Sequence, residues 1–139
     1  MGAAVRDVMA KNPVTLPGST PLVEAAKNMK EKDIGDIIIV DGDKLRGVVT
    51  DRDIVVRGIA EGRDPNSTKL EDVCTSDLVT LPPDASVDEA AKLMRDKAIR
   101  RIPVEENGKP IGIISIGDVA QERDQDSALA DISAKPGNN

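Results

Sequence analysis

The chain has 139 residues, with 19 Lys and Arg against 25 Asp and Glu, and it contains no Trp, Tyr, Phe or His. The absence of histidine excludes a zinc site of the usual kind and a Ser-His-Asp triad, and the single cysteine, Cys74, excludes an intrachain disulfide. The net charge of −6 and the lack of aromatic rings argue against a nucleic-acid partner.

No apolar run approaches the roughly 20 residues that a membrane-spanning helix needs. The first residues also lack the apolar core of a signal peptide. We therefore expect no membrane association and a cytoplasmic location.

An internal repeat organises the chain, because residues 5–54 and 70–119 align without a gap. Val14-Thr15-Leu16-Pro17 falls on Val79-Thr80-Leu81-Pro82, and Glu24-Ala25-Ala26-Lys27 falls on Glu89-Ala90-Ala91-Lys92. Such a repeat indicates one supersecondary unit used twice.

The first repeat predicts a short helical turn, a brief strand, a helix, a hairpin of two apolar strands and a second helix. The first helix has an apolar stripe at i, i+3, i+4 and i+7, preceded by Thr20-Pro21 as its cap and first residue. The predicted bounds are Val5–Met9 for the turn, Val14–Leu16 for the strand, Leu22, Ala25, Ala26 and Met29 for the stripe, Ile37–Val40 and Gly47–Thr50 for the hairpin, and a start near Asp51 for the second helix.

The second repeat predicts the same order, with a capping box at Ser86-Val87-Asp88-Glu89. The corresponding bounds are Leu70–Cys74, Val79–Leu81, a stripe of Val87, Ala90, Ala91 and Met94, a hairpin of Ile102–Val104 and Ile111–Ser115, and a start near Gly117. The fold class is therefore α+β, with two units of order β-α-β-β-α. The predicted domains are 5–58 and 70–123, with a linker at 59–69 and a frayed polar tail at 124–139.

One motif occurs at the same phase of both repeats: Gly, two apolar residues, Thr or Ser, two residues, then Asp. It spans residues 47–53 and 112–118, so the hydroxyl ends a strand and the carboxylate lies in the first turn of a helix. A carboxylate there can accept hydrogen bonds from a ribose diol, and the hydroxyl and the helix N-terminus can donate to a phosphate. The same spacing is also that of a helix capping box, which needs no ligand.

Together with Ile99-Arg100-Arg101-Ile102-Pro103-Val104 and the two Val-Thr-Leu-Pro segments, this motif resembles a tandem pair of CBS domains, named for cystathionine β-synthase. The resemblance covers roughly residues 5–120. It implies two units packed about a pseudo-twofold axis, with clefts between them that bind AMP, ADP, ATP, S-adenosylmethionine or related ligands, and a homodimer.

The resemblance further implies which residues bind the ligand. Asp53 and Asp118 would contact ribose, and Thr50 and Ser115 would contact phosphate or sugar. The adenine pockets would be lined by Thr15, Thr80, Ile37, Ile102 and Pro103.

Arg100 and Arg101 stand where family members often place a phosphate-binding basic residue, whereas the first repeat has Gly35 and Asp36 at that phase. Arginine forms bidentate bonds to phosphate and aspartate repels it. We therefore expect the Ser115/Asp118 site to be the stronger phosphate site. An exposed arginine pair at a strand start, with no ligand, is the alternative.

These observations predict a non-catalytic regulatory module that binds an adenosine-containing nucleotide, requires no cofactor or metal, and signals to an unidentified effector protein. The alternative is a structural or protein-interaction module with no small-molecule ligand. An enzyme is disfavoured, because neither a P-loop nor a nucleophile–base pair is present in the sequence. Cys74 aligns with Met9 and is expected to pack as an apolar residue.

Overall fold

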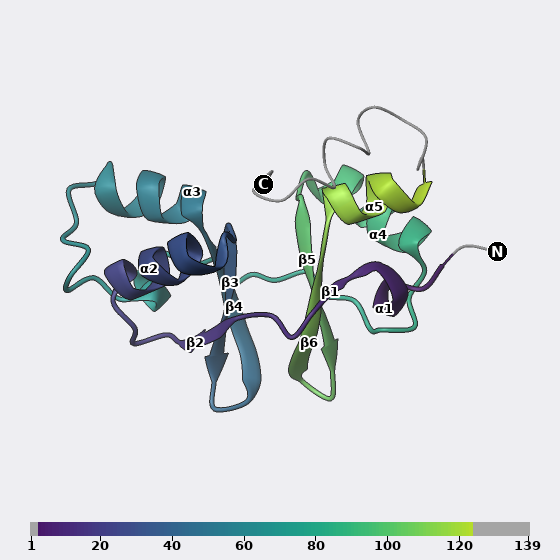
Figure 1. The fold of residues 1–139 in the computed structure, drawn as a ribbon, viewed down its shortest axis with the longest axis horizontal. Helices are drawn as coiled ribbons and strands as arrows, with labels where there is room; N and C mark the ends of the chain where they lie inside the picture. Colours follow the sequence, from purple (N-terminus) through teal and green to yellow (C-terminus); the bar gives the residue numbers. More distant parts are fainter. Residues whose placement is uncertain (1–2, 124–139) are drawn as a thin grey trace. The chain divides into compact units, whose positions relative to one another are not determined.

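Each sequence repeat supplies one hairpin and its covering helices to a mixed α+β chain, as predicted (Figure 1). The computed structural model describes residues 3–123, so the predicted tail 124–139 lies outside the described residues. Two compact units are present: a central unit of residues 14–78, and a split unit that joins the residues up to Pro13 to those from Val79 onward. No helix within residues 3–123 is long and apolar enough to cross a membrane.

The central unit is built on a sheet in the order β2-β3-β4. Strand β2 pairs parallel to β3 and β3 pairs antiparallel to β4. Its elements are β2 (Thr15–Pro17), α2 (Leu22–Lys32), β3 (Asp36–Asp41), β4 (Lys44–Thr50), α3 (Asp51–Asp53), the π-helix η1 (Ile54–Ile59) and the 3₁₀ turn η2 (Leu70–Asp72).

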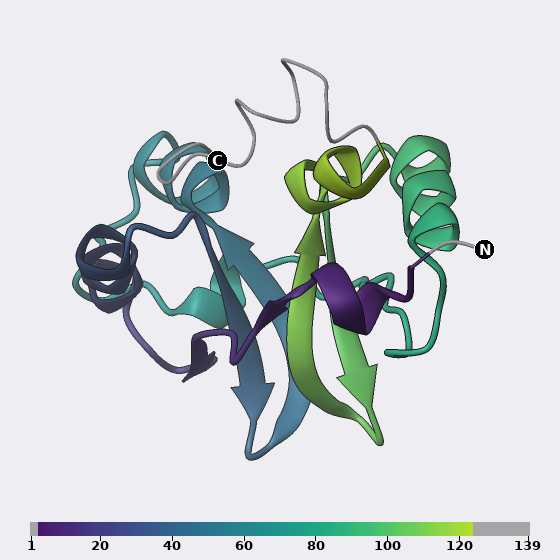
Figure 2. The same cartoon turned by 45° about the vertical axis from the view of Figure 1, so that its right-hand side comes forward.

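The split unit has a sheet in the order β1-β6-β5, with both pairings antiparallel. In both units the hairpin is accompanied by helices of the same unit, as the second view shows (Figure 2). The elements of the split unit are α1 (Val5–Val8), β1 (Ala10–Lys11), α4 (Val87–Lys97), β5 (Arg101–Glu106), β6 (Lys109–Ser115) and α5 (Ile116–Arg123).

Helices α2 and α4 form where the apolar stripes predicted them. Three of the four stripe positions are buried in each helix, whereas Ala26 is exposed and Ala91 is half-buried. The Ser86 hydroxyl accepts from the Glu89 amide at 3.0 Å, as expected for a cap. The predicted Thr20 cap is wrong, because Pro21 occupies the N-cap of α2 and no side chain caps that end.

One predicted strand is reduced to a single bridge. Leu81 pairs with Val104, but residues 79–81 do not form a strand matching β2. Pro82 and Pro83 follow immediately, and proline has no amide N–H to extend a ladder. The third strand of this sheet is β1, which pairs with β6 at the opposite edge of the hairpin from Leu81.

The opening turn of each repeat packs in the unit that holds the other repeat's hairpin. Val5 of α1 is fully buried with the apolar residues of the split unit, and its amide donates to the Ala85 carbonyl at 2.8 Å. Leu70 of η2 is fully buried in the core of the central unit, and its amide donates to the Thr20 carbonyl at 2.9 Å. The repeats in the sequence and the compact units in the structure therefore have different boundaries, because each opening turn packs in the unit of the other repeat's hairpin.

Substituting these two turn residues should destabilise different units. Removing two methyl groups from a buried valine, as in Val5→Ala, should cost roughly 2 kcal/mol, and Leu70→Ala should cost about 3 kcal/mol. Amide hydrogen exchange read by mass spectrometry should rise mainly in residues 79–123 for Val5→Ala and mainly in residues 14–69 for Leu70→Ala. The opposite pattern would contradict the exchange of turns between repeats.

Candidate functional site

The two repeated motifs fold into matching junctions between a strand and a helix. In the central unit the Asp53 amide donates to Thr50 Oγ1 at 3.1 Å and the Thr50 amide donates to Asp53 Oδ2 at 2.9 Å. In the split unit the Asp118 amide donates to Ser115 Oγ at 3.1 Å and the Ser115 amide donates to Asp118 Oδ2 at 2.8 Å. The capping box is therefore formed at both junctions. It engages one oxygen of each carboxylate and fixes the direction of both side chains.

The glycine that opens each motif is required by close backbone approach. A Cβ at Gly47 would lie 2.8 Å from the Thr75 carbonyl oxygen, and one at Gly112 would lie 2.9 Å from the Ala10 carbonyl oxygen and collide with the Met9 sulfur. Thr75 exchanges two hydrogen bonds with Val48, both 3.0 Å long. These glycines are therefore explained by the segments that cross β4 and β6, not by a ligand.

The Asp53 carboxylate is partly neutralised within its own unit. Its side chain is 15% exposed, and Oδ1 lies 3.9 Å from Nε of Arg57, one turn further along the chain. Arg57 also donates from Nη1 to the Val73 carbonyl at 3.4 Å. This arginine contributes positive charge at the central junction that the motif itself does not encode.

The Asp118 carboxylate has a different environment. Burial raises its pKa above the ordinary value, and the hydrogen bonds with Ser115 oppose that shift. Within residues 3–123 no basic side chain forms an ion pair with it. Asp118 is thus a half-buried acceptor with only its Oδ2 engaged by the cap.

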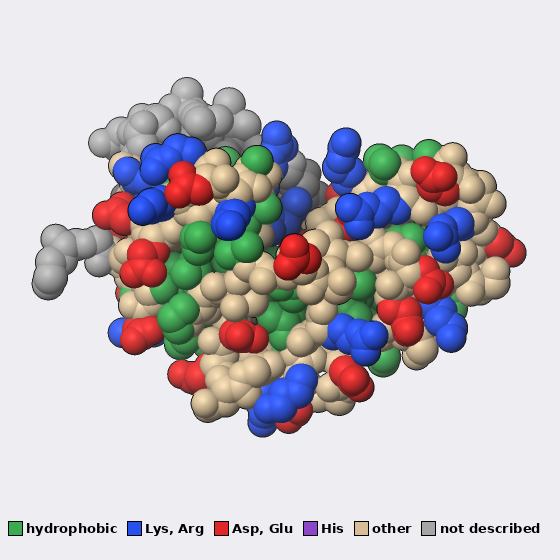
Figure 3. Space-filling model, turned by 180° about the vertical axis from the view of Figure 1, so that it is seen from behind, with side chains coloured by type: hydrophobic (Ala, Val, Ile, Leu, Met, Phe, Trp, Pro, Cys, Tyr) green, Lys and Arg blue, Asp and Glu red, His purple; other side chains and the backbone are tan. Residues whose placement is uncertain are grey.

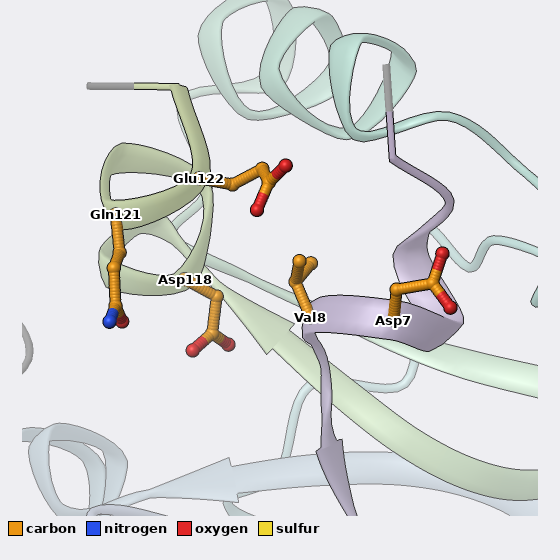
Figure 4. A pocket seen from close by; sticks show the side chains of 5 residues that line it. All are labelled: Asp7, Val8, Asp118, Gln121 and Glu122. Carbon is orange, nitrogen blue, oxygen red and sulfur yellow. The ribbon is translucent and has the colours of Figure 1, made fainter. Parts of the chain in front are cut away.

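A hollow of about 250 Å³ lies beside Asp118 and is shown close up in Figure 4. Asp118, Gln121 and Glu122 reach it from α5, and Asp7 and Val8 reach it from α1. Three of the five lining residues are acidic and none is basic. Glu122 falls on Arg57 in the repeat, so the sequence alone could have indicated it, whereas Asp7 reaches the hollow only through the packing of the split unit.

The other residues predicted to bind a ligand differ in how far their side chains are buried. Ile37 and Ile102, at 1% and 0% exposure, pack into the apolar cores of their units, and Pro103 is buried on β5. Thr15 is exposed on β2, and Thr80 donates to Glu105 Oε1 at 3.3 Å.

The two arginines lie at the start of β5, near the junction of the split unit. Arg101 is half-buried and pairs with Ser115 across the β5–β6 ladder, and Arg100 is exposed. The Arg100 carbonyl accepts from the Ile116 amide at 2.8 Å, where α5 begins. The structure therefore brings Arg101, Ser115 and Asp118 together on neighbouring elements of one unit. In the central unit, Asp36 takes the matching place opposite Thr50.

Cys74 packs at the edge of the central core, as predicted for an apolar residue, and is half-buried. Burial raises the pKa of its thiol above the ordinary value, partly offset by Arg46. Burial therefore disfavours the thiolate form of Cys74.

Comparison with known proteins places this architecture in a family. The model of the CBS domain matches residues 5–58 and again residues 70–124. The chain is 47% identical over 116 residues to the uncharacterized protein YlbB of Bacillus subtilis, covering 79% of this chain and 78% of that protein. These matches define the class as proteins with a pair of CBS domains.

Two solved structures resemble the fold. A putative signal-transduction protein with CBS domains from Burkholderia ambifaria matches with a TM-score of 0.82 at 31% identity, covering 90% of this chain and 96% of that one. The CBS domain pair of protein MJ0100, in complex with 5′-methylthioadenosine and S-adenosyl-L-methionine, matches with a TM-score of 0.80 at 27% identity, covering 91% and 100%. This chain belongs to the CBS-domain family.

Replacing each site aspartate by asparagine should change the free energy of unfolding differently at the two junctions. An asparagine oxygen can still accept the capping hydrogen bond, so each change mainly removes charge. Asp53→Asn loses the partner of Arg57 and should cost about 0.5 kcal/mol. Asp118→Asn removes a carboxylate that is costly to ionise when buried, so at pH 7 it should be at least as stable as wild type.

The pH dependence has a definite sign. Because the folded-state pKa of Asp118 is raised, ionisation destabilises the fold as the pH rises from the unfolded pKa through the folded one. The stability difference between Asp118→Asn and wild type should therefore shrink as the pH falls from 7 towards 4. Thermal unfolding followed by circular dichroism would measure it. A large loss of stability in Asp118→Asn at pH 7 would contradict this account.

Proposed function

We propose that this CBS pair is a non-catalytic regulatory module that binds an adenosine-containing nucleotide of the AMP, ADP, ATP or S-adenosylmethionine class. The observation that carries the proposal is the junction formed twice, in which a hydroxyl and an aspartate are held together after a strand. The aspartates would accept hydrogen bonds from the ribose diol. Ligand binding would bias the conformation or the dimer and so signal to an effector protein.

We assign to the remaining predicted residues roles that suit their positions. Thr50 and Ser115 would bind sugar or phosphate, and Thr15, Thr80 and Pro103 would border the adenine. Arg100 and Arg101 would bind an anionic group of the ligand, which suits the guanidinium fork. Ile37 and Ile102, being buried in the cores, would support the strands that carry these groups.

The complex of MJ0100 with two adenosine compounds supports the ligand class, because this chain matches that CBS pair over its whole length. At each junction the capping box holds hydrogen-bond donors and acceptors in place. Groups fixed in this way suit the recognition of a polar ligand. The same capping boxes also favour the alternative, an interaction module without a small-molecule ligand. They give hydrogen-bond partners to the backbone amides at both helix starts, and no ligand is needed for that.

Ultraviolet absorbance distinguishes these alternatives directly. The chain has no Trp, Tyr or Phe, so a purine released from the purified, denatured protein would dominate the near-ultraviolet spectrum. We expect either such a peak or binding of AMP, ATP or S-adenosylmethionine in calorimetric titration. Asp53→Ala and Asp118→Ala should each abolish or weaken one site by about tenfold or more, because a buried charge-assisted hydrogen bond is lost. No purine and no binding by any of the three would favour the interaction module.

We further propose that the chain forms a homodimer through η1. Val55, Val56 and Ile59 are 57%, 43% and 51% exposed on this short helix, and exposed apolar side chains gathered on one element favour an interface. A carboxylate there would be desolvated in a dimer, so Ile59→Asp should shift the mass measured by light scattering from dimer to monomer. Ala26→Asp, at an exposed position on α2, adds the same charge away from η1 and is the matched control. An unchanged dimer in Ile59→Asp, or a wild-type monomer, would contradict the proposal.

A further inference from the structure

The opening arm of the chain, residues 3–11, packs on residues that lie far beyond it in the sequence. The Val5 amide donates to the Ala85 carbonyl at 2.8 Å, and the Val5 side chain is fully buried. The Ala3 carbonyl accepts from the Val87 amide at 2.9 Å, and strand β1 pairs with the edge of β6. The surface that receives the arm is therefore complementary to it both in backbone pairing and in apolar packing.

A short connection of Asn12 and Pro13 joins this arm to residues 14–78. Asn12 has a left-handed backbone, with φ of 54°. Asparagine tolerates this conformation better than most residues, but a residue before proline prefers extended backbone, because the proline ring crowds it. The bend at Asn12 is therefore maintained by the packing of the segments on either side of it.

A second copy of this chain offers the same receiving surface to the arm. An arm that leaves its own unit can make the same contacts on another copy, so the closed and exchanged forms differ only in the connection and in the entropy of association. A short connection under strain favours such an exchange. Over the described residues of the face in Figure 3, acidic and basic side chains are interspersed, so that face presents no field of one sign to another copy.

We propose that the arm exchanges between two copies of this chain when the chain folds at high concentration. In the exchanged dimer, α1 and β1 of each chain complete the sheet of the other. The hollow beside Asp118 is then lined by Asp7 and Val8 of the second copy, so that two chains build each hollow. The closed form prevails in dilute solution, because the arm there meets its own unit at a far higher effective concentration. The exchange requires no nucleotide.

Isotope mixing across one disulfide tests the exchange. Ala4 and Ser86 form an antiparallel bridge, and Cα atoms paired in this way lie about 4.5–5.5 Å apart, within the range of a disulfide. Ala4→Cys and Ser86→Cys are combined with Cys74→Ser, and equal amounts of unlabelled and heavy-nitrogen-labelled chain are unfolded together. The mixture is refolded under reducing conditions at millimolar concentration, where a second copy competes for the arm, and is then oxidised and digested.

The mass of the peptides linked between positions 4 and 86 reports which chain supplied each arm. We expect a link with one light and one heavy half after refolding at high concentration. We expect no such link from chains that are folded separately and mixed in dilute solution. A dimer through η1 with closed arms keeps each link within one chain, so the mixed link should persist in Ile59→Asp.

Substitutions of Asn12, whose side chain is exposed, change the connection without removing packing. Glycine adopts a positive φ without strain, whereas valine does not. The ratio of exchanged to closed chains should therefore be about tenfold higher in Asn12→Val than in Asn12→Gly. Asp33→Val is the matched control, because Asp33 is an exposed residue with φ of 55° at the C-cap of α2, and it should leave the ratio at its starting value.

Three results would overturn the exchange. The first is a refolded mixture that contains only all-light and all-heavy links. The second is an equal ratio in Asn12→Gly and Asn12→Val, and the third is loss of the mixed link in Ile59→Asp. Thermal unfolding of each variant verifies that it folds.

Discussion

The reciprocal hydrogen bonds between Ser115 and Asp118, and between Thr50 and Asp53, determine how each hairpin passes into the helix that follows. Each box satisfies donors at a helix start that would otherwise lack partners near the apolar core. It also holds the carboxylate at the end of a strand, half-buried, instead of leaving it mobile in water. The stability of the junction and the presentation of its acceptor oxygen therefore depend on the same two bonds.

The helices and hairpins could be predicted from the sequence because their signals are local. Apolar spacing placed α2 and α4, and the turn residues around Gly42 and Gly108 placed both hairpins. The exchange of opening turns was not predictable in this way. The repeat associates Val5 with the strands that follow it, whereas its burial depends on residues beyond position 80. The π-helix η1 could likewise not be predicted. Its i→i+5 hydrogen bonds, such as that from the Ala60 amide to the Val55 carbonyl, correspond to no distinct spacing of apolar residues in the sequence.

For the site, the spacing of the motif is that of a capping box, and the structure forms it: each hydroxyl accepts from the aspartate amide and each carboxylate accepts from the Thr or Ser amide. Burial was beyond the sequence: three successive residues of β3 and of β5 are buried, so the apolar run alone does not say that Ile37 and Ile102 face the cores. The acidic hollow depends on Asp7, which precedes Asp118 by most of the chain and joins it only through the split unit. Glu122 was accessible to sequence reasoning through its match to Arg57.

A ligand bound as we propose would share each carboxylate with the capping box. The backbone takes Oδ2 at both junctions, so a ribose diol would be left with Oδ1. At Asp53 that oxygen faces Arg57, which a ligand must displace or engage, and an anionic ligand can do the latter by bonding to the freed guanidinium. At Asp118 no cation needs displacement, but the carboxyl must remain ionised against burial, and a donor or cation in the hollow would stabilise the charged form. One repeated motif thus holds its second carboxylate oxygen in two different environments, because Arg57 lies beside Asp53 whereas no basic side chain within residues 3–123 forms an ion pair with Asp118.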